Sequence, residues 1–514
     1  MPPINKSRIA KNTAALYFRM LLMMLITLYA TSVVLNVLGE TDYGVYSLVA
    51  GIVTLFSFLS ATMATASQRF FAVELGVENH TKLKQIFSIN VLIFIIIAVV
   101  IFILTETLGL WYLKTKAVIP ADRMNAAAWV FHFAILTFTV SIITTPYLAI
   151  ITAREKLHVY AYLGILEVAL KLAILFVLIY LPGDKLKLYA VLLFFIQILI
   201  SAAYITYSTV KFPECKLKYY WNSAMFKEVL SFAGWNITGS LATVARSQGI
   251  TLLLNLFFGV LINAARGVAV QVYSALSQFS LSFFTAVRPQ IIKSHSVDPE
   301  DKSGEMMKLI FQSSKFCYYL VLILSIPVLI ETEAILSIWL RNTVPDYTVI
   351  FTRLIIINAI IESLANPFVA ALHATGRIKM YQIVTSSIIL LTLPVSYLFL
   401  KLGFPPQSTM YILVVLTAIA QLSRVYFMKN MLKMNVLNYV KHVILPISGV
   451  TLLAFILPLL CYYSFSASFL RIAGVAAMTV ISSIFIIYYI GLTKLERVSL
   501  KKFIFARSKS INVK

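Results

Sequence analysis

Long apolar stretches recur from one end of this 514-residue chain to the other, and they constrain its fold more than any other feature. Each stretch has about 18 residues or more, enough to cross about 30 Å of hydrocarbon as a helix that rises about 1.5 Å per residue. No long polar block separates them, so the sequence leaves no room for a soluble domain of ordinary size. Only 12% of the residues are charged, against roughly a quarter in soluble domains. We therefore expect an all-α integral membrane protein.

The apolar stretches predict about fourteen transmembrane helices. They are 13–38, 44–67, 86–112, 124–151, 159–181, 188–210, 229–258, 268–287, 309–330, 348–372, 380–400, 410–426, 443–463 and 469–492. Helices one to six form an expected N-terminal lobe at 1–210, and helices seven to twelve a C-terminal lobe at 229–430. A linker at 211–228 joins the lobes, and helices thirteen and fourteen occupy 431–514 with a basic tail.

The distribution of Lys and Arg predicts the orientation of the chain in the membrane. Most of the 43 basic residues, including those of both ends and of the linker, fall on one side of the predicted helices. That side is expected to be cytoplasmic. The net charge of +23 then reflects topology and anionic lipid headgroups rather than a nucleic-acid partner. The three cysteines are scattered and indicate neither a disulfide framework nor a metal site.

Two pairs of segments repeat along the chain. Pro-Tyr-Leu-Ala at 146–149 matches Pro-Phe-Val-Ala at 367–370, and the Leu-Asn and Gly residues of 35–39 match those of 254–259, both at an offset of about 220 positions. An even number of helices separates the copies. The repeat therefore predicts two lobes in the same orientation, related by an axis along the membrane normal. Chance similarity between apolar segments is the alternative.

Polar residues follow one face of three predicted helices, at steps of three and four residues. They are Ser47, Thr54, Ser57, Thr65 and Gln68 on helix two; Asn236, Ser240, Thr243 and Ser247 on helix seven; and Gln271, Ser274, Gln278, Ser282 and Thr285 on helix eight. Hydrogen bonding between packed helices would explain any one of these stripes. Because helices two and eight are equivalent in the repeat, the set favours a shared polar cavity.

Charged residues inside the membrane are costly and usually functional. Arg246 lies deep in helix seven, beside Gln248. Basic residues that face a cavity would suit an anionic group such as a phosphate. For Arg19 on helix one the alternative is snorkelling to the cytoplasmic headgroups, and for Arg266 it is anchoring at the far interface. Glu167 and Lys171 are spaced to pair with each other on helix five.

The chain lacks the motifs of several enzyme classes. It has no GxxxxGK[ST], HExxH or GxSxG segment, so ATP hydrolysis, zinc proteolysis and nucleophile-elbow hydrolysis find no support. The predicted loops on the non-cytoplasmic side are short, which disfavours a membrane glycosyltransferase or polysaccharide polymerase with a catalytic loop. We expect no enzyme activity, no catalytic residues and no cofactor.

Several segments resemble Wzx-type polysaccharide flippases, of the superfamily that also contains MATE multidrug exporters and the lipid II flippase MurJ. They are Leu-Asn-Val-Leu-Gly at 35–39 with Tyr-Gly-Val-Tyr at 43–46, Thr-Ala-Ser-Gln-Arg-Phe at 65–70, Arg-Ser-Gln-Gly-Ile at 246–250, Asn-Ala-Ala-Arg-Gly at 263–267 and Arg-Pro-Gln-Ile-Ile at 288–292. The resemblance implies a bundle that moves an undecaprenyl-pyrophosphate oligosaccharide across the bacterial inner membrane by alternating access.

The resemblance also implies functional residues and partners. By position, it implies Arg19, Arg69 and Arg266 as ligands of the pyrophosphate headgroup, and the intramembrane charge and polar stripes add Arg246, Gln248, Gln271 and Gln278 as candidate ligands. Candidates for coupling to a proton or sodium gradient, which is usual in that superfamily, are Asp42, Glu167 and Glu362. Membrane lipids, a polysaccharide polymerase and a chain-length protein are the implied partners. A MATE-type exporter of organic cations is the main alternative. It would need buried carboxylates, whereas the charges within these helices are mainly basic.

Overall fold

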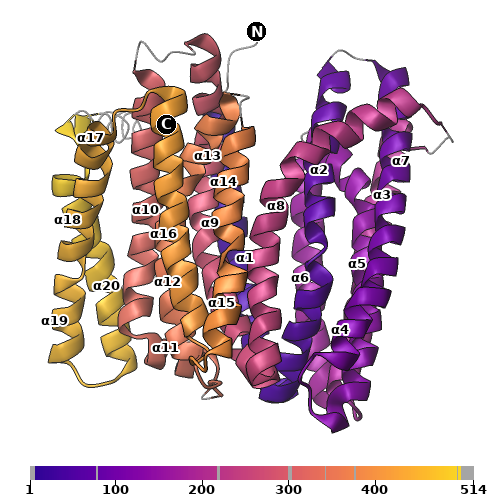
Figure 1. Cartoon of the computed structure of the whole chain (residues 1–514), viewed down its shortest axis with the longest axis horizontal. Helices are drawn as coiled ribbons and strands as arrows, with labels where there is room; N and C mark the ends of the chain where they lie inside the picture. The colour runs from indigo at the N-terminus through magenta and orange to yellow at the C-terminus, as the bar shows by residue number, and fades with distance from the viewer. Residues whose placement is uncertain are drawn as a thin grey trace, which may run out of the picture. The chain divides into compact units, whose positions relative to one another are not determined.

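The computed structural model describes residues 6–76, 79–154, 156–216, 220–298, 304–341, 343–375, 378–494 and 496–498. Every regular element in these ranges is a helix, and Figure 1 shows long helices running side by side. The expectation of an all-α protein is confirmed.

The helices of the first half of the chain are α1 (Lys6–Thr54), α2 (Ser57–Gly76), α3 (His80–Leu104), α4 (Leu110–Thr115), α5 (Met124–Ala153), α6 (Leu157–Tyr180), α7 (Lys185–Lys211) and α8 (Ser223–Phe258). A π-helical turn at Thr105–Gly109 joins α3 to α4. Within this half α5 packs against α1, α2, α3 and α7, so it lies at the centre of its group.

The second half contains α9 (Val260–Val297), α10 (Glu305–Ile330), α11 (Thr332–Trp339), α12 (Thr348–Ser363), α13 (Ala365–Ala374), α14 (Lys379–Leu390), α15 (Thr392–Lys401), α16 (Ser408–Leu432), α17 (Val436–Tyr439), α18 (Leu445–Ala454), α19 (Ile456–Ser464) and α20 (Phe469–Ile486). The last helices form a hairpin, in which α19 packs against α20, and α20 packs against α10.

Proline explains three interruptions of otherwise continuous apolar segments. The breaks at Leu364, Leu391 and Phe455 separate α12 from α13, α14 from α15, and α18 from α19. Each break stands three residues before a proline, at 367, 394 and 458. A proline ring clashes with the carbonyl group four residues earlier and donates no hydrogen bond, so the helical ladder opens at that point.

Two glycines interrupt the helices with a left-handed backbone conformation. Gly39 interrupts α1 with a φ of 81°, and Gly259 separates α8 from α9 with a φ of 78°. Residues with a side chain rarely adopt this left-handed region, whereas glycine enters it without a steric penalty. The two glycines are also equivalent positions of the sequence repeat.

Twelve helices of the described chain are long and apolar enough to cross a membrane, so the predicted number of fourteen is not confirmed. Twelve of the predicted segments each correspond to one of these spans. The exceptions are helix two, which is divided between the end of α1 and α2, and helix eight, which lies in α9. Neither α2 nor α9 is among the twelve, because the Ser, Thr, Gln and Arg residues on these helices lower their hydropathy.

Two compact units make up the chain, and each has its own apolar core. The first contains Met1–Gln271, Trp339–Thr348 and Ser386–Ile412, and the second contains Val272–Ile338, Val349–Thr385 and Leu413–Lys514. Residues such as Leu48 and Phe131 fill a core of the first unit, and Leu322 and Phe368 fill that of the second. The lobes expected from the sequence repeat divide the chain by symmetry, whereas these two units divide it by contacts. The lobe boundaries therefore stay a prediction.

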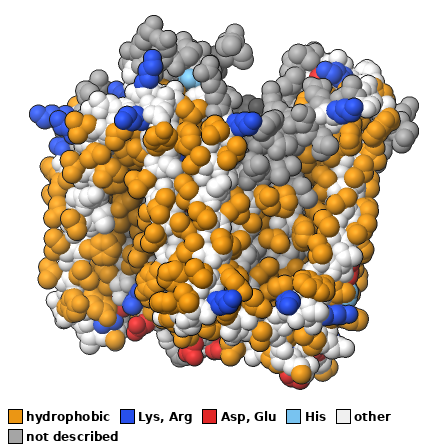
Figure 2. Space-filling model, viewed as in Figure 1, with side chains coloured by type: hydrophobic (Ala, Val, Ile, Leu, Met, Phe, Trp, Pro, Cys, Tyr) orange, Lys and Arg blue, Asp and Glu red, His pale blue; other side chains and the backbone are white. Residues whose placement is uncertain are grey.

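Large apolar side chains also cover the outside of the helices. Figure 2 shows hydrophobic side chains along the length of the described helices, with Lys and Arg mainly near the helix ends. Leu470 and Tyr463 are 82% and 81% exposed. Such a surface is stable only against lipid, and the charged ends suit the two headgroup layers. The chain is a multi-pass membrane protein.

Candidate functional site

A buried arginine on α9 is the central feature of the candidate site. The Arg266 side chain donates hydrogen bonds from Nε to Thr251 Oγ1 at 3.0 Å and from a terminal nitrogen to the Ser247 carbonyl oxygen at 2.9 Å. Its other terminal nitrogen contacts the sulfur of Met410 at 3.6 Å. Arg266 is only 3% exposed, and no Asp or Glu of the described chain forms a salt bridge with it. These three partners are all electrically neutral.

A second buried arginine stands near the first. Arg246 on α8 is 7% exposed, and its charge repels that of Arg266. The hairpin made by α8 and α9 produces this approach, because its chain reverses at Gly259. Arg266 follows the turn by about 10 Å of helix and Arg246 precedes it by about 20 Å, at about 1.5 Å per residue. Positive charge thus gathers inside a membrane-spanning hairpin, where it is costly.

Close backbone packing brings α1 against this hairpin. A Cβ atom at Gly44 would stand 2.1 Å from the carbonyl oxygen of Val260, and one at Gly267 would stand 2.9 Å from Ser47 Oγ. A Cβ atom at Gly51 would lie 3.3 Å from the side-chain oxygen of Gln248. Glycine therefore lets the second part of α1 pack directly onto the residues around the arginine pair.

One buried amide on α9, near Arg266 in the sequence, has no hydrogen-bond partner among the described residues. Asn263 is fully buried one turn before Arg266 on α9, and neither its Oδ1 nor its Nδ2 has a partner among the described residues. A buried polar group without a partner costs about 1 to 3 kcal/mol. Asn263 belongs to the Asn-Ala-Ala-Arg-Gly segment on which the family resemblance mainly depends.

A cavity of about 220 Å³ lies inside the first unit, between α1, α5 and α7. Its lining is mostly apolar, with polar groups from Tyr46, Thr54, Ser141 and Gln197. Thr54 belongs to the predicted stripe of helix two, so part of that stripe does line a cavity. Ser47, another member, instead packs at Gly267.

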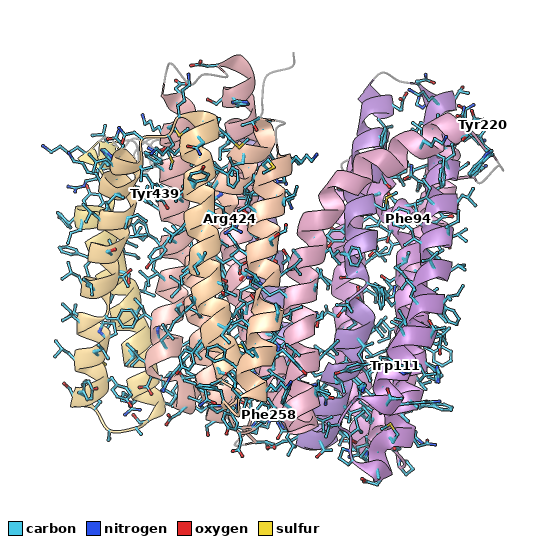
Figure 3. All side chains as sticks on the ribbon, in the orientation of Figure 1. Phe94, Trp111, Tyr220, Phe258, Arg424 and Tyr439 are labelled. Carbon is cyan, nitrogen blue, oxygen red and sulfur yellow. The ribbon has the colours of Figure 1, made fainter. Side chains whose placement is uncertain are left out.

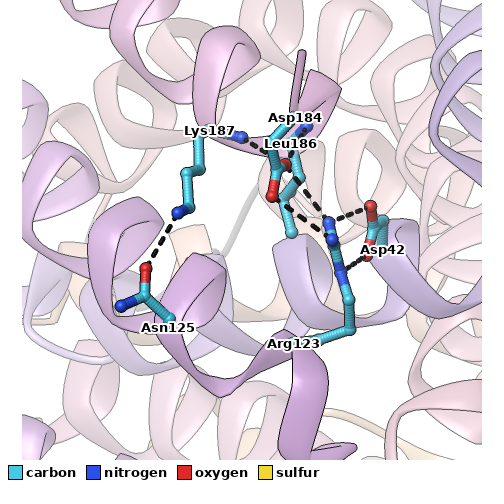
Figure 4. Close-up of polar contacts among 6 residues, drawn as sticks. All are labelled: Asp42, Arg123, Asn125, Asp184, Leu186 and Lys187. Carbon is cyan, nitrogen blue, oxygen red and sulfur yellow. Dashed lines mark hydrogen bonds and ion pairs between the residues drawn. The ribbon is translucent and has the colours of Figure 1, made fainter.

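Two of the three predicted coupling carboxylates are engaged in ion pairs. Asp42 accepts a hydrogen bond from Arg123 Nε at 2.7 Å, and the same guanidinium contacts Asp184 at 3.2 Å (Figure 4). Burial tends to raise the pKa of Asp184, but hydrogen bonds from the Lys187 backbone and Arg123 outweigh it and lower that pKa. Asp42 and Asp184 thus tie α1 and α7 to the start of α5.

Glu167 pairs with Lys171 at 2.6 Å, as their spacing on one helix indicated. Glu362 on α12 is in a different setting. Its carboxylate accepts hydrogen bonds from Tyr273 Oη at 2.7 Å and Asn358 Nδ2 at 3.2 Å, and Thr417 donates to Asn358 Oδ1 at 2.7 Å. This cluster of oxygen and amide groups lies within the second unit. No group of three or more His, Cys, Asp or Glu side chains suited to a metal ion occurs in the described chain.

The other predicted ligands are less informative. Gln248 and Gln271 are half-buried, and Gln278 is exposed. The side chains of Arg19, Arg69, Thr65 and Asn236 lie outside the described residues. Their proposed contacts with a headgroup stay predictions.

Several buried charges were not predicted from the sequence. Arg424, labelled partway along α16 in Figure 3, is 7% exposed and contacts Gln421 at 3.4 Å. Lys315 on α10 forms a buried ion pair with Glu496 at 2.7 Å. The buried Glu331 pairs at 2.6 Å with Arg471, which is half-buried. A charge within an apolar segment is the signal that could have revealed Arg424 and Lys315.

Solved structures of membrane transporters share this fold. An inward-facing MATE-family multidrug transporter of the MOP superfamily matches with a TM-score of 0.68 and 12% identity, over 81% of this chain and 98% of that one. The lipid II flippase MurJ, in an inward closed conformation, matches with a TM-score of 0.62 and 13% identity, over 91% and 98% of the two chains. The MATE multidrug transporter DinF-BH matches with a TM-score of 0.57 and 14% identity, over 84% and 99%.

Sequence comparison supplies the family. No curated protein sequence gave a significant match to this chain. The model of the family described as polysaccharide biosynthesis protein matches residues 9–295, more than half of the chain. The predicted resemblance is confirmed, and the family that matches and the structures that share this fold are not described as enzymes. The chain belongs to the polysaccharide biosynthesis protein family of Wzx-type flippases, and its fold is shared with the solved MATE and MurJ structures.

Proposed function

We propose that this chain moves an undecaprenyl-pyrophosphate-linked oligosaccharide from the cytoplasmic to the periplasmic leaflet of a bacterial inner membrane, by alternating access. The observation that carries the proposal is the Arg246 and Arg266 pair, in which Arg266 contacts neutral groups of the described chain. An anion that entered between the lobes would neutralise this charge, and a pyrophosphate offers oxygens for bidentate contacts with guanidinium groups.

The buried state of both arginines fits an alternating mechanism. A substrate reaches them only after α1 separates from the α8–α9 hairpin, since glycine packing at Gly44 and Gly267 leaves no space between these helices. Hydrogen bonds from Arg266 to Thr251 and Ser247 would then be exchanged for contacts with the headgroup. The free energy of headgroup binding would favour the conformation that makes these contacts, and it would thereby shift the equilibrium between conformations.

Export of organic cations is the second candidate function, because the Glu362 cluster offers a carboxylate within the membrane. Asp42 and Glu167 are already paired with Arg123 and Lys171, so they favour a structural role. Glu362 also suits a different task, the binding of a proton or sodium ion that drives the flippase. We favour this coupling role because the arginine pair would repel a cationic substrate.

The proposed orientation places both termini and the loop at 212–226 in the cytoplasm, because basic residues concentrate there. The turns at Gly39 and Gly259 then face the periplasm. A polysaccharide polymerase and a chain-length protein would receive the saccharide on that side. Labelling of single cysteines near these turns from outside intact cells tests the orientation, and labelling within the loop at 212–226 instead would contradict it.

Purified chain in lipid vesicles allows a direct test of the arginine pair. Arg266→Ala should reduce translocation of lipid-linked oligosaccharide about 10- to 100-fold, since hydrogen bonds to charged groups contribute about 1.5 to 3 kcal/mol. Arg266→Lys should retain part of the activity, because it keeps the charge but loses the fork of donors. Arg246→Ala should behave like Arg266→Ala.

Arg353 supplies a matched control, since its side chain is 40% exposed and lies in the second unit. Arg353→Ala should translocate at the wild-type rate. Thermal unfolding in detergent must accompany each assay, because a buried arginine also supports the fold. Well-folded Ala variants at both 246 and 266 that translocate normally would rule out this headgroup site.

A further inference from the structure

Two asparagines at equivalent positions of the repeat make the same kind of contact. Asn36 on α1 donates from Nδ2 to the carbonyl oxygen of Leu340 at 3.1 Å and accepts a hydrogen bond from Thr343 at 3.2 Å. Asn255 on α8 donates to the carbonyl oxygen of Val118 at 3.2 Å and accepts from its backbone N–H at 3.0 Å. Each asparagine therefore holds the backbone or side chains of a loop far away in the sequence.

The two contacts are reciprocal between the predicted lobes. Asn36 lies in the N-terminal lobe and holds the loop before α12 in the C-terminal lobe. Asn255 lies in the C-terminal lobe and holds the loop before α5 in the N-terminal lobe. The asparagines are separated by about 220 positions, and so are Val118 and Leu340, which is the offset of the sequence repeat. A pseudo-twofold axis would exchange one contact for the other.

Aromatic donors strengthen both contacts in the same reciprocal way. The indole Nε1 of Trp339 donates to the carbonyl oxygen of Leu28 at 2.7 Å, and Ser32 also bonds to the Trp339 carbonyl. The hydroxyl of Tyr112 donates to the carbonyl oxygen of Leu252 at 2.9 Å. All these residues belong to the first compact unit, which explains why Trp339–Thr348 clusters with the N-terminal part of the chain.

The position of the contacts relates them to transport. Asn36 and Asn255 stand three and four residues before Gly39 and Gly259, at the membrane end opposite the predicted cytoplasmic side. Close packing of Gly44 against Val260 lies beside them. Any opening between the lobes at this end would have to break both contacts, because each one joins the two lobes.

We propose that Asn36 and Asn255 form a reciprocal latch that closes the periplasmic side of the transporter and must open on both sides of the axis for the substrate to leave. The proposal rests on the proposed function for its role in transport. Its geometry stands independently of the substrate.

Disulfide locking tests the latch in the full-length chain. The native cysteines at 215, 317 and 461 are all buried, and burial raises the pKa of the Cys215 thiol to about 12. They are replaced by Ala so that the introduced cysteines are the only thiols that can be oxidised. Cysteine pairs are then placed at Asn36 and Thr343, or at Val118 and Asn255. Oxidation of either pair alone should stop translocation of lipid-linked oligosaccharide, and reduction should restore it to the rate of the unoxidised variant.

A pair at Ser67 and Asn90 gives a matched control, because these side chains hydrogen-bond at 2.6 Å between α2 and α3 within one predicted lobe. Its oxidation should leave translocation unchanged. Fully cross-linked latch variants that translocate as fast as their reduced forms would overturn the proposal.

Accessibility gives a readout that needs no substrate. Val260 is 4% exposed and packs at Gly44, so a single cysteine at 260 should react slowly with a membrane-impermeant maleimide added outside intact cells. Asn36→Ala or Asn255→Ala should increase this rate about tenfold, because each change removes two hydrogen bonds of the closed state. Asn125→Ala, which removes a contact with Lys187 inside one lobe, should not.

The two measurements test the latch and the proposed substrate independently of each other. If the wild-type chain moves no lipid-linked saccharide, the proposed function is contradicted. The rates of maleimide labelling would still show whether Asn36 and Asn255 hold the periplasmic side closed. Equal rates in the Asn→Ala variants and the parent would contradict the latch, even if translocation of the saccharide were confirmed.

Discussion

Arginines in this chain differ in what neutralises their charge. Arg123 contacts two carboxylates, those of Asp42 and Asp184, and Arg471 contacts that of Glu331. Arg266 contacts a hydroxyl, a carbonyl and a thioether instead. A structural arginine needs a permanent counter-ion when it is buried, whereas one that binds an anionic substrate must be free to take its counter-ion from that substrate.

Asn263 allows a prediction that separates stability from transport. Asn263→Leu removes an amide with no partner among the described residues and keeps a similar volume, so it should raise the free energy of unfolding by about 1 to 3 kcal/mol. If the amide finds a partner only in another conformation or with substrate, translocation should fall in the same variant. Thermal unfolding and vesicle translocation measure the two effects.

Asn90 offers a control for this substitution, because it is also fully buried but bonds to Ser67 and to a backbone carbonyl. Asn90→Leu should lower the stability. A destabilised Asn263→Leu variant would show instead that the amide has a partner in the folded state and would contradict our account of this residue.

Local sequence patterns reveal charges at this scale but not their partners. Arg246 and Arg266 stand out because charged residues are rare in apolar segments. The Glu167 and Lys171 pair could be predicted because both residues lie one turn apart on one helix. The partners of Lys315 and Asp42 are far away in the sequence, and no local pattern indicates them.

At the scale of helices, polar contacts fasten the C-terminal hairpin to α10 within the second unit. Lys315 on α10 contacts Glu496 and the carbonyl oxygen of Gly491, and the hydroxyl of Tyr319 reaches the same carbonyl at 3.3 Å. Arg471 at the start of α20 pairs with Glu331 at the end of α10. These contacts hold α20 at both of its ends.

Lys315 and Glu496 give the prediction for this element. Lys315→Met alone should lower the free energy of unfolding by about 3 to 5 kcal/mol, because it leaves a buried carboxylate without its cation. The double variant Lys315→Met/Glu496→Leu should recover most of this loss. Thermal unfolding of detergent-purified variants checks it, and equal stability of the single variant and the wild type would show that the pair is not buried in the folded chain.

Apolar runs predicted the positions of most membrane-spanning segments, but not the interruptions within them. Prolines at 367, 394 and 458 mark breaks that an apolar count overlooks. The polarity of α2 and α9 also has a physical meaning. Polar side chains on a membrane helix can hydrogen-bond to packed neighbours, and α2 carries part of the helix-two stripe while α9 carries the helix-eight stripe.

At the scale of the whole molecule, the internal repeat connects the sequence to the mechanism. The Leu-Asn and Gly match near 35–39 and 254–259 corresponds to two left-handed glycines and two asparagines with equivalent contacts. The sequence match could not show what the asparagines hold, because the loops at 118 and 340 lack any periodic pattern. Transport by two lobes that separate at either side in turn remains our proposal.

The central claim is that the chain moves an anionic lipid-linked saccharide, and translocation by wild-type chain in vesicles tests it most directly. Three substrates should be compared under the same ion gradient: undecaprenyl-pyrophosphate oligosaccharide, the same saccharide on an uncharged lipid, and an organic cation. We predict translocation of the pyrophosphate-linked saccharide alone, because only this substrate carries a counter-ion for Arg266, whose described contacts are neutral. Translocation of the cation, or equal rates for the charged and uncharged lipids, would contradict the account.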